Sequence, residues 1–457
     1  MVQNHKTDLF ENMPVSKALA IMAVPTIISQ LITLIYNMSD TWFVGRTGNP
    51  YMVAASSLVL TVYLMAGALA NLFGVGGGTL VVRLLGSKNE DDAKQTAGWT
   101  LAAAAVVGLC FSAVCLLFMN PLLRLLGASD RTIHFARQYL FFVIVLGGFF
   151  NITSSTMSFL LRNVGFSREA AFGLGMGGLL NIALDPLFMF VLLPDGMQVI
   201  GAGIATMLSN VASFLYYIIV YKKVRGRCVL EIPKGFPKIS RELLRDLLSV
   251  GIPASFSVFL FDLTNIVINR LSSSHGDIEL AAIGIVIKAE RLPLNVGIGI
   301  CLGMVPLVAY NYASGNFKRM RSIFTASRIA GLAVSVLSII LYRSFASQII
   351  GAFIPEERTV LLGTAFLKAR CFAAPFMFLS FNMVHFMQAV DRGGVSFRLC
   401  VIRQIFLNIP FLFVLNRLFG MSGIVWTQVT ADIFNVVVSY IIYDKIIRQI
   451  VNFRDSL

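Results

Sequence analysis

Residues 95–123 read QTAGWTLAAAAVVGLCFSAVCLLFMNPLL, an uncharged stretch flanked by Lys94 and Arg124. Its length exceeds the roughly 20 residues that an α-helix needs to cross the ~30 Å hydrocarbon core of a bilayer. It is apolar on every side and lacks the alternation of polar and apolar residues that a strand of an outer-membrane barrel would show. This stretch therefore predicts a transmembrane helix.

Similar stretches recur along the whole chain, for example at 138–161 and 292–317. Of the 457 residues, 57% are hydrophobic and only 13% are charged, with a mean hydropathy of +0.78, which is outside the usual composition of soluble domains. The sequence therefore predicts an all-α integral membrane protein. We place twelve transmembrane helices at residues 16–44, 51–82, 95–120, 138–160, 169–193, 198–221, 247–271, 279–312, 325–349, 362–389, 395–416 and 421–443.

Basic residues are distributed unevenly between the predicted loops. The chain has 37 Lys and Arg against 23 Asp and Glu, a formal net charge of +14. Twenty-five of the basic residues lie on the N-terminal side of the predicted membrane and ten on the opposite side, while Lys288 and Arg291 fall inside a span. This bias predicts that both termini and the linker 222–245 are cytoplasmic. We interpret the basic linker as contacting anionic lipid headgroups, and we expect no nucleic-acid partner.

Several functional classes lack their signatures in this sequence. The six cysteines form no CxxC pair, and no HExxH motif or P-loop lysine occurs, so we expect no metal site, no cofactor and no enzymatic activity. No apolar core with a small-residue cleavage site is present in the first 17 residues, so we expect the first span to be retained. Because no P-loop lysine marks a site for ATP, uphill transport would depend on an ion gradient.

An internal repeat with a period of about 228 residues divides the chain. It predicts an N-terminal lobe at 1–221, the cytoplasmic linker at 222–245 and a C-terminal lobe at 246–457. Six spans in each half would relate the lobes by an axis along the membrane normal, and the interface between them is the expected substrate path. The matching landmarks are Pro25 and Pro253, Ala54 and Ala281, Gly86 and Gly315, Asp130 and Glu357, and Asn181 and Asn408.

Two carboxylates occur inside predicted spans of the first half. Asp185 lies one helical turn after Asn181, and the first span carries a polar face made of Thr33, Tyr36, Asn37 and Asp40. A charged residue at the centre of a bilayer costs roughly 2.5–3.5 kcal/mol, so such carboxylates commonly serve proton or cation paths. The alternatives are a water-exposed helix end for Asp40 and, for Asp185, compensation of backbone groups freed by the following proline.

Pro25 and the charged residues of the second half have separate interpretations. Pro25 interrupts the hydrogen-bond ladder of the first span and is a candidate hinge. Lys288, Glu290 and Arg291 could neutralise one another, directly or across neighbouring helices, as structural ion pairs. Asp262 has no obvious partner, and Asp432 is the remaining acid inside a predicted span of this half.

A set of motifs in a fixed order resembles the multidrug and toxic compound extrusion (MATE) family, and the resemblance covers essentially the whole chain. The resemblance implies two six-helix lobes around a V-shaped cleft, alternating access, and export of cationic amphipathic compounds in exchange for protons or Na⁺. The motifs are YNMSDT at 36–41, FVG at 43–45, NIALDP at 181–186, GAGIAT at 201–206 and PLVAYN at 306–311, followed by Gly315, Asn316 and Arg319.

The resemblance also implies roles for individual residues. Asp40, Asn181 and Asp185 would form a cation-coupling network, together with Tyr36 and Asn37. For the substrate cleft we name Thr206, Asn151, Gln30 and Asp262.

One branch of the family also uses acids in the seventh and tenth spans. Asp262 lies at or beside the seventh-span position, but residues 362–390 contain no acid, which favours protons over Na⁺ as the coupling ion.

The main alternative is a flippase for lipid-linked oligosaccharides from the same superfamily. It would need a cationic cleft for a pyrophosphate group, whereas Asp40 and Asp185 are acidic. A major-facilitator carrier would carry a characteristic charged loop between its second and third spans, which residues 86–92 do not match. An antiporter is thus the expected function. We also expect the protein to be monomeric and to lie in the inner, or plasma, membrane.

Overall fold

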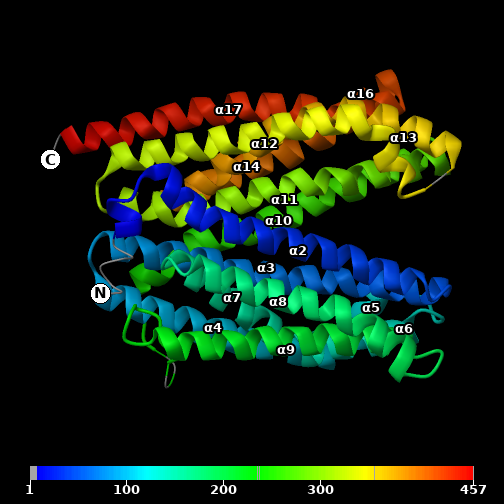
Figure 1. Cartoon of the computed structure of the whole chain (residues 1–457), viewed down its shortest axis with the longest axis horizontal. Helices are drawn as coiled ribbons and strands as arrows, with labels where there is room; N and C mark the ends of the chain where they lie inside the picture. Colours follow the sequence, from blue (N-terminus) through cyan, green and yellow to red (C-terminus); the bar gives the residue numbers. More distant parts are fainter. Residues whose placement is uncertain (1–7, 234, 236, 355, 456–457) are drawn as a thin grey trace.

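The computed structural model consists of helices that run side by side along one long axis (Figure 1). It describes residues 8–233, 235, 237–354 and 356–455, without the side chains of residues 259, 262 and 450–455. The first half contains α2 (Val15–Gly45), α3 (Pro50–Gly86), α4 (Glu90–Leu117), α5 (Met119–Leu125), α6 (Ile133–Leu140), η1 (Phe141–Leu146), α7 (Gly148–Asn163), α8 (Ser167–Pro186), η2 (Leu187–Leu192) and α9 (Gln198–Val224). The second half contains α10 (Arg241–Ser273), α11 (Asp277–Ala313), α12 (Phe317–Gly351), α13 (Glu357–Arg370), η3 (Cys371–Ala373), α14 (Ala374–Ala389), α15 (Gly393–Val401), η4 (Ile402–Asn408), α16 (Ile409–Phe419) and α17 (Met421–Asp455).

The number of spans agrees with the prediction of twelve. Within the described residues, eleven helical stretches are long and apolar enough to cross a membrane. The twelfth is the pair Ile133–Leu146 and Gly148–Asn163, which is bent by 45° at the break. Many large apolar side chains on the outside are exposed, such as Leu117 at 75%. A soluble protein would rarely expose so much apolar surface, whereas a bilayer covers it.

Asparagine caps occur at equivalent helices of the two halves, as the sequence repeat predicts. The side chain of Asn89 caps α4 by accepting from the backbone N–H of Asp92 at 3.3 Å, and Asn316 caps α12 by accepting from that of Arg319 at 3.1 Å. Capping by Asn satisfies an N–H group that the first turn of a helix leaves free. An asparagine cap therefore begins the third span of each half.

The helices form two lobes, α2–α9 and α10–α17, which approach each other at the end of the molecule where both chain termini lie (Figure 1). There, a Cβ atom on Gly303 would lie 2.6 Å from the Cα atom of Ala23, and one on Gly299 would lie 2.7 Å from that of Ile27. Only glycine allows α11 to pack this closely on α2. Toward the opposite end the ribbons of the two lobes diverge.

The segment 8–13, which precedes α2, ties the two lobes together at this contacting end. The guanidinium of Arg319 on α12 donates to the backbone carbonyls of Phe10 at 2.8 Å and Met13 at 2.6 Å. The hydroxyl of Tyr310 donates to Oε1 of Glu11 at 2.6 Å. Charge-assisted bonds of this kind are stronger than neutral ones, so the segment holds this end of the molecule closed.

Candidate functional site

The structure brings the two predicted carboxylates of the first lobe into one site. Asp40 lies on α2 and is half-buried, and Asp185 lies near the end of α8 and is fully buried. Tyr139 of α6 donates its hydroxyl to Oδ2 of Asp40 at 3.5 Å and interacts electrostatically with both acids. The two carboxyl groups also interact with each other.

Polar side chains connect these acids through two further helices. The amide of Asn181 donates to Oδ1 of Asp185 and to Oγ1 of Thr206 on α9, both at 3.3 Å. The Tyr139 hydroxyl also lies within hydrogen-bonding reach of Thr206. We call the set Asp40, Tyr139, Thr206, Asn181 and Asp185 the acid network.

The acid network contains oxygens that are buried but not hydrogen-bonded. Oδ1 of Asp40, Oδ2 of Asp185 and Oδ1 of Asn181 accept no hydrogen bond from any described residue. Neither acid belongs to an ion pair in the described part of the chain. A buried carboxylate without a partner is unfavourable, and oxygen ligands suit a proton or a hard cation. The arrangement can therefore bind either.

A second polar chain lies beside the acid network. Asn151 of α7 donates to the hydroxyl of Tyr63 at 2.9 Å and to Oδ1 of Asn210 at 3.5 Å. The Tyr63 hydroxyl is 3.4 Å from that of Tyr36, which interacts electrostatically with Asp40. The predicted residues Tyr36 and Asn151 are thus joined to the acids through α3.

Four other predicted residues lie apart from these contacts. Asn37 is exposed and donates to a backbone carbonyl of its own helix at 2.8 Å. Gln30 is half-buried, and no hydrogen bond between described side chains joins it to the acid network. Pro25 lies within α2, which continues as a helix on both sides. The side chain of Asp262 is outside the described part of the structure.

Three residues of the site were missed by the sequence analysis: Tyr63, Tyr139 and Asn210. Each is a polar residue in or at the end of an otherwise apolar predicted span, so a signal was present. The first-span motif drew attention to the polar face of α2 alone. Tyr63 on α3 and Tyr139 on α6 reach that face, and Asn210 on α9 reaches Asn151, only because the helices pack together.

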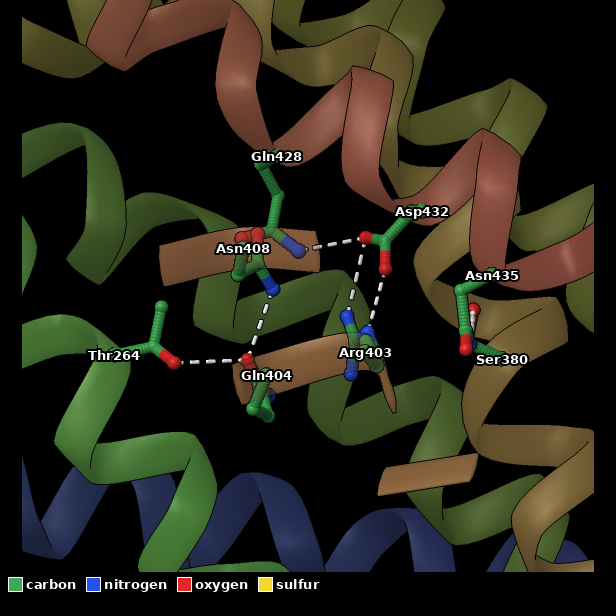
Figure 2. Close-up of polar contacts among 8 residues, drawn as sticks. All are labelled: Thr264, Ser380, Arg403, Gln404, Asn408, Gln428, Asp432 and Asn435. Atoms are coloured by element: carbon green, nitrogen blue, oxygen red, sulfur yellow. Dashed lines mark hydrogen bonds and ion pairs between the residues drawn. The ribbon is translucent and has the colours of Figure 1, made fainter. Parts of the chain in front are cut away.

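The second lobe also buries an acid, but that acid is paired. Arg403 of η4 donates to Asp432 of α17 from Nε at 2.5 Å and from Nη2 at 3.1 Å (Figure 2). Gln428 donates to the same carboxylate at 2.6 Å. Both charged side chains are almost completely buried. Such a doubly bonded pair neutralises its charges internally.

A chain of amides lies next to this pair. Thr264 of α10 and Asn408 of η4 both donate to Oε1 of Gln404 at 2.9 Å (Figure 2). Asn408 is the repeat counterpart of Asn181, which belongs to the acid network. The two equivalent asparagines therefore have different partners in the two lobes.

Glu290 forms another largely buried ion pair in the described part of the second lobe. Nε of Arg370 donates to both of its carboxylate oxygens, at 2.9 and 2.8 Å. Lys288 and Arg291, the neighbours that the sequence also offered as partners, are exposed. The expectation of structural ion pairing across helices is thus met for Glu290, with a partner on α13.

These features define a class of protein: a polytopic membrane transporter made of two helical lobes, with unpaired acids inside one lobe. A model of one family, described as MatE, matches residues 25–187 and 253–414. These segments cover most of both lobes, and their starts lie 228 positions apart, as the internal repeat predicts. The chain belongs to this family, the MATE transporters.

Relatives of similar length support the assignment. The chain is 30% identical to Multidrug export protein MepA of Staphylococcus aureus (strain MRSA252) over 423 residues, which is 93% of this chain and 92% of the relative. It is 28% identical to the protein of the same name from Staphylococcus saprophyticus subsp. saprophyticus over the same shares of both chains.

Solved structures share the fold. The chain resembles the outward-facing conformation of a multidrug resistance MATE family transporter of the MOP superfamily, with a TM-score of 0.91 and 21% identity over 97% of this chain and 98% of that one. It also resembles a MOP superfamily transporter from Pyrococcus furiosus Vc1 (DSM3638), with a TM-score of 0.86 and 22% identity over 95% and 97%. At these identities the likeness establishes the fold alone.

Proposed function

We propose that the protein exports cationic amphipathic compounds in exchange for protons, by alternating access. The observation that carries the proposal is the acid network, in which Asp185 is buried and Asp40 is half-buried, and neither has a cationic partner among the described residues. The relatives named above are multidrug export proteins, which supports this class of substrate. The same acidity argues against a flippase for pyrophosphate-linked lipids, which would need a cationic interior.

The proposed exchange of a cationic compound for protons follows from electrostatics. A cationic compound in the first lobe is stabilised by the carboxylates of Asp40 and Asp185, because opposite charges attract strongly where water is scarce. Protons that bind these carboxylates remove the counter-charge and weaken the binding of the compound. Uptake of protons would also alter the Tyr139 contact to α2, and so favour one packing of α2 over another.

Protons are the coupling ion that we favour. The tenth span lacks an acid between residues 362 and 390, so the tenth-span acid that one branch of the family uses is absent. Na⁺ remains the second candidate because of the three unbonded oxygens of the acid network.

The distribution of basic residues supports an orientation with both termini in the cytoplasm. In that orientation, the end closed by segment 8–13 is cytoplasmic and the molecule opens outward. The similarity to an outward-facing transporter supports this assignment of the state.

Export of a fluorescent cationic dye from proteoliposomes tests the function. We expect transport under an imposed pH gradient, loss of that transport in Asp40→Asn, and full transport in Asp195→Asn. Asp195 is an exposed acid of the same lobe, outside the acid network, and serves as the matched control. Transport driven only by a Na⁺ gradient would replace the proton with Na⁺, and no dye movement under either gradient would contradict drug export.

A further inference from the structure

Helices α4 and α12 are the equivalent third spans of the two halves, but the same face of each helix carries different residues. The capping residues Asn89 and Asn316 set the register, because they begin the two helices in the same way. Positions four and seven residues apart lie on one face of a helix. The equivalent pairs on this face are Lys94 and Arg321, Gly98 and Thr325, and Leu101 and Arg328.

In the first lobe, the linker between the lobes covers this face. Nζ of Lys94 pairs with Oε1 of Glu231 at 3.3 Å. Two turns further into α4, Leu101 is buried in the same apolar cluster as the linker residues Val229 and Leu230. The face of α4 therefore receives a carboxylate at its charged end and apolar groups beyond it.

In the second lobe, the equivalent face lies open. Arg321 and Thr325 are exposed, and Arg328 is half-buried. Helices α12 and α17 lie side by side in the part of this lobe that faces away from the first lobe (Figure 1). Nη1 of Arg328 donates to the hydroxyl of Tyr440 on α17 at 3.0 Å, which joins the two helices at this level.

The exposed side chains of α12 and α17 place Arg328 at the boundary of the hydrocarbon. Toward the end of the molecule where the termini lie, Arg321 and Lys445 are exposed. Further along, Ile329 is 64% and Ile441 is 66% exposed, as expected for side chains that face lipid tails. Helical side chains lean toward the N-terminus of their helix, so the guanidinium of Arg328 is directed toward the charged end.

Neutral groups hold the guanidinium of Arg328 in place. It lies over the rings of Phe324 and Tyr440, at 4.6 and 5.8 Å, and Nη2 donates to Oγ1 of Thr325 at 3.0 Å. Its Nε is buried and has no acceptor among the described residues, and each terminal nitrogen carries a second N–H group. A guanidinium fixed in this way suits the oxygens of a phosphate.

The positive charge of this face has no carboxylate of its own. Neither Arg321 nor Arg328 belongs to an ion pair within the described part of the chain. Asp444, which acts electrostatically on Tyr443 as both arginines do, is already paired with Arg448 at 2.6 Å. The face therefore lacks the anion that the linker supplies in the first lobe.

We propose that an anionic phospholipid binds this face of α12 and takes the place that the linker takes on α4. Its phosphate bonds Arg321 and Arg328, and its acyl chains follow the exposed apolar residues beyond them. In the first lobe, Glu231 supplies the corresponding anion to Lys94. Charge and depth select this ligand, because a soluble anion has no chains and a zwitterionic phospholipid has no net charge. The site does not depend on the proposed transport function.

Native mass spectrometry of the full-length protein in an uncharged detergent tests the site. The protein receives phosphatidylglycerol and phosphatidylcholine with identical acyl chains. The ratio of the two bound fractions measures the preference for the anionic lipid. This ratio is compared between variants, because effects shared by both lipids cancel.

Arg328→Gln and Arg321→Gln should each lower this preference about fivefold, which corresponds to about 1 kcal/mol for one basic residue near the membrane surface. Arg321→Gln removes no hydrogen bond between described residues, so it tests the site even if loss of the Tyr440 bond destabilises Arg328→Gln. Arg343→Gln is the matched control, and its preference should stay at the wild-type value. Arg343 is exposed on the same helix and also lies over an aromatic ring, that of Phe372, at 5.3 Å.

The thermal unfolding midpoint reports whether each variant is folded. A preference that stays at its wild-type value in folded Arg321→Gln and Arg328→Gln overturns the site. Glycerol 3-phosphate added at the concentration of the lipid should displace no phosphatidylglycerol. Displacement would also overturn the proposal, because the face would then bind a soluble phosphate. Neither result depends on whether the protein exports dye.

Discussion

Both lobes hold acids in their interior, but the partners of these acids differ. In the first lobe, Asp40 and Asp185 are held by neutral groups, namely a tyrosine hydroxyl and an asparagine amide. In the second lobe, Asp432 and Glu290 are each bonded by an arginine. A carboxylate that already has a guanidinium has little to gain from a proton or a cation, whereas an unpaired carboxylate gains much.

The two halves of this duplicated fold therefore differ in how their interior charges are neutralised. Asn181 and Asn408 occupy equivalent positions in the repeat, yet the first bonds an acid and the second bonds Gln404. The second lobe thus has an asparagine at the equivalent position, but arginines neutralise its interior acids. We expect the first lobe to exchange ions and the second to keep a constant charge. Two measurements test this difference directly, and two further measurements concern the contact between the lobes and an acid outside both interiors.

The largest effect is expected at Asp185. Asp185→Asn should abolish dye export driven by a pH gradient, because the amide cannot take up a proton. Its thermal unfolding midpoint should stay at the wild-type value or rise, since a buried acid without a cationic partner is removed. Proteoliposome transport and a thermal melt of the same preparation check both parts. Export that persists in this variant would contradict the proposal that the ion site lies in the first lobe.

The next effect concerns the stability of the second lobe. Arg403→Met leaves Asp432 as an unpaired buried acid and should destabilise the protein by about 3–5 kcal/mol. The double variant Arg403→Met, Asp432→Leu removes both charges and should recover most of this loss. Thermal unfolding in detergent compares the three proteins. Equal stability of the single and double variants would show that the pair is not a structural unit.

A smaller effect is expected where the lobes meet. Arg319→Met removes the bonds to the carbonyls of Phe10 and Met13, and hydrogen bonds to charged groups contribute about 1.5–3 kcal/mol each. The closed end should therefore open more often. The rate of thiol labelling at Ser255→Cys, a position on α10 that donates to α3 across the lobes, should rise about tenfold or more.

Arg321→Met serves as the control for this measurement, because Arg321 is an exposed arginine on the same helix. An unchanged labelling rate in Arg319→Met would mean that segment 8–13 does not hold the lobes together.

The smallest effect is expected at Glu356, an exposed acid that lies outside the interior of both lobes. Glu356 caps α13, and the hydrogen bonds from Thr359 and from the backbone of Arg358 lower the pKa of its carboxyl below the usual value. A lowered folded-state pKa stabilises the protein above the ordinary pKa of glutamate, and this stabilisation is lost as the pH falls through the folded-state value. Glu356→Gln should slightly lower the unfolding midpoint at neutral pH.

The difference from wild type should shrink as the pH falls from neutral, and it should vanish at an acidic pH below the lowered folded-state pKa of Glu356, where the glutamate is protonated in both states. A difference that is the same at both pH values would mean that the cap does not depend on the charge of Glu356.

The spans were predictable because they depend on local composition. A run such as 95–123 must cross a bilayer whatever its neighbours are, since burying its apolar side chains outweighs any alternative. The caps at Asn89 and Asn316 are also local, because each asparagine bonds a backbone N–H three residues later. Asp40 and Asp185 stood out because a charge in an apolar run is rare.

The partners of these residues were not predictable in the same way. Glu290 was expected to be neutralised, but its partner Arg370 lies 80 positions away, on a helix whose rotation no local pattern specifies. Asn37 shares the polar face of α2 with Asp40, yet it ends exposed and bonded to its own backbone. Spacing along one helix shows which residues share a face, but not which neighbouring helix that face meets.

The helical membrane fold and the two acids of the first lobe could be predicted from hydrophobicity and charge along the chain, and the duplication from landmarks that recur at one offset. The packing of the helices was needed to show that Tyr139 donates to Asp40, that arginines neutralise the acids of the second lobe, and that segment 8–13 connects the lobes at one end. The physical reason is that hydrogen bonds and ion pairs act over about 3 Å, and only the packing of helices distant in sequence brings their atoms that close.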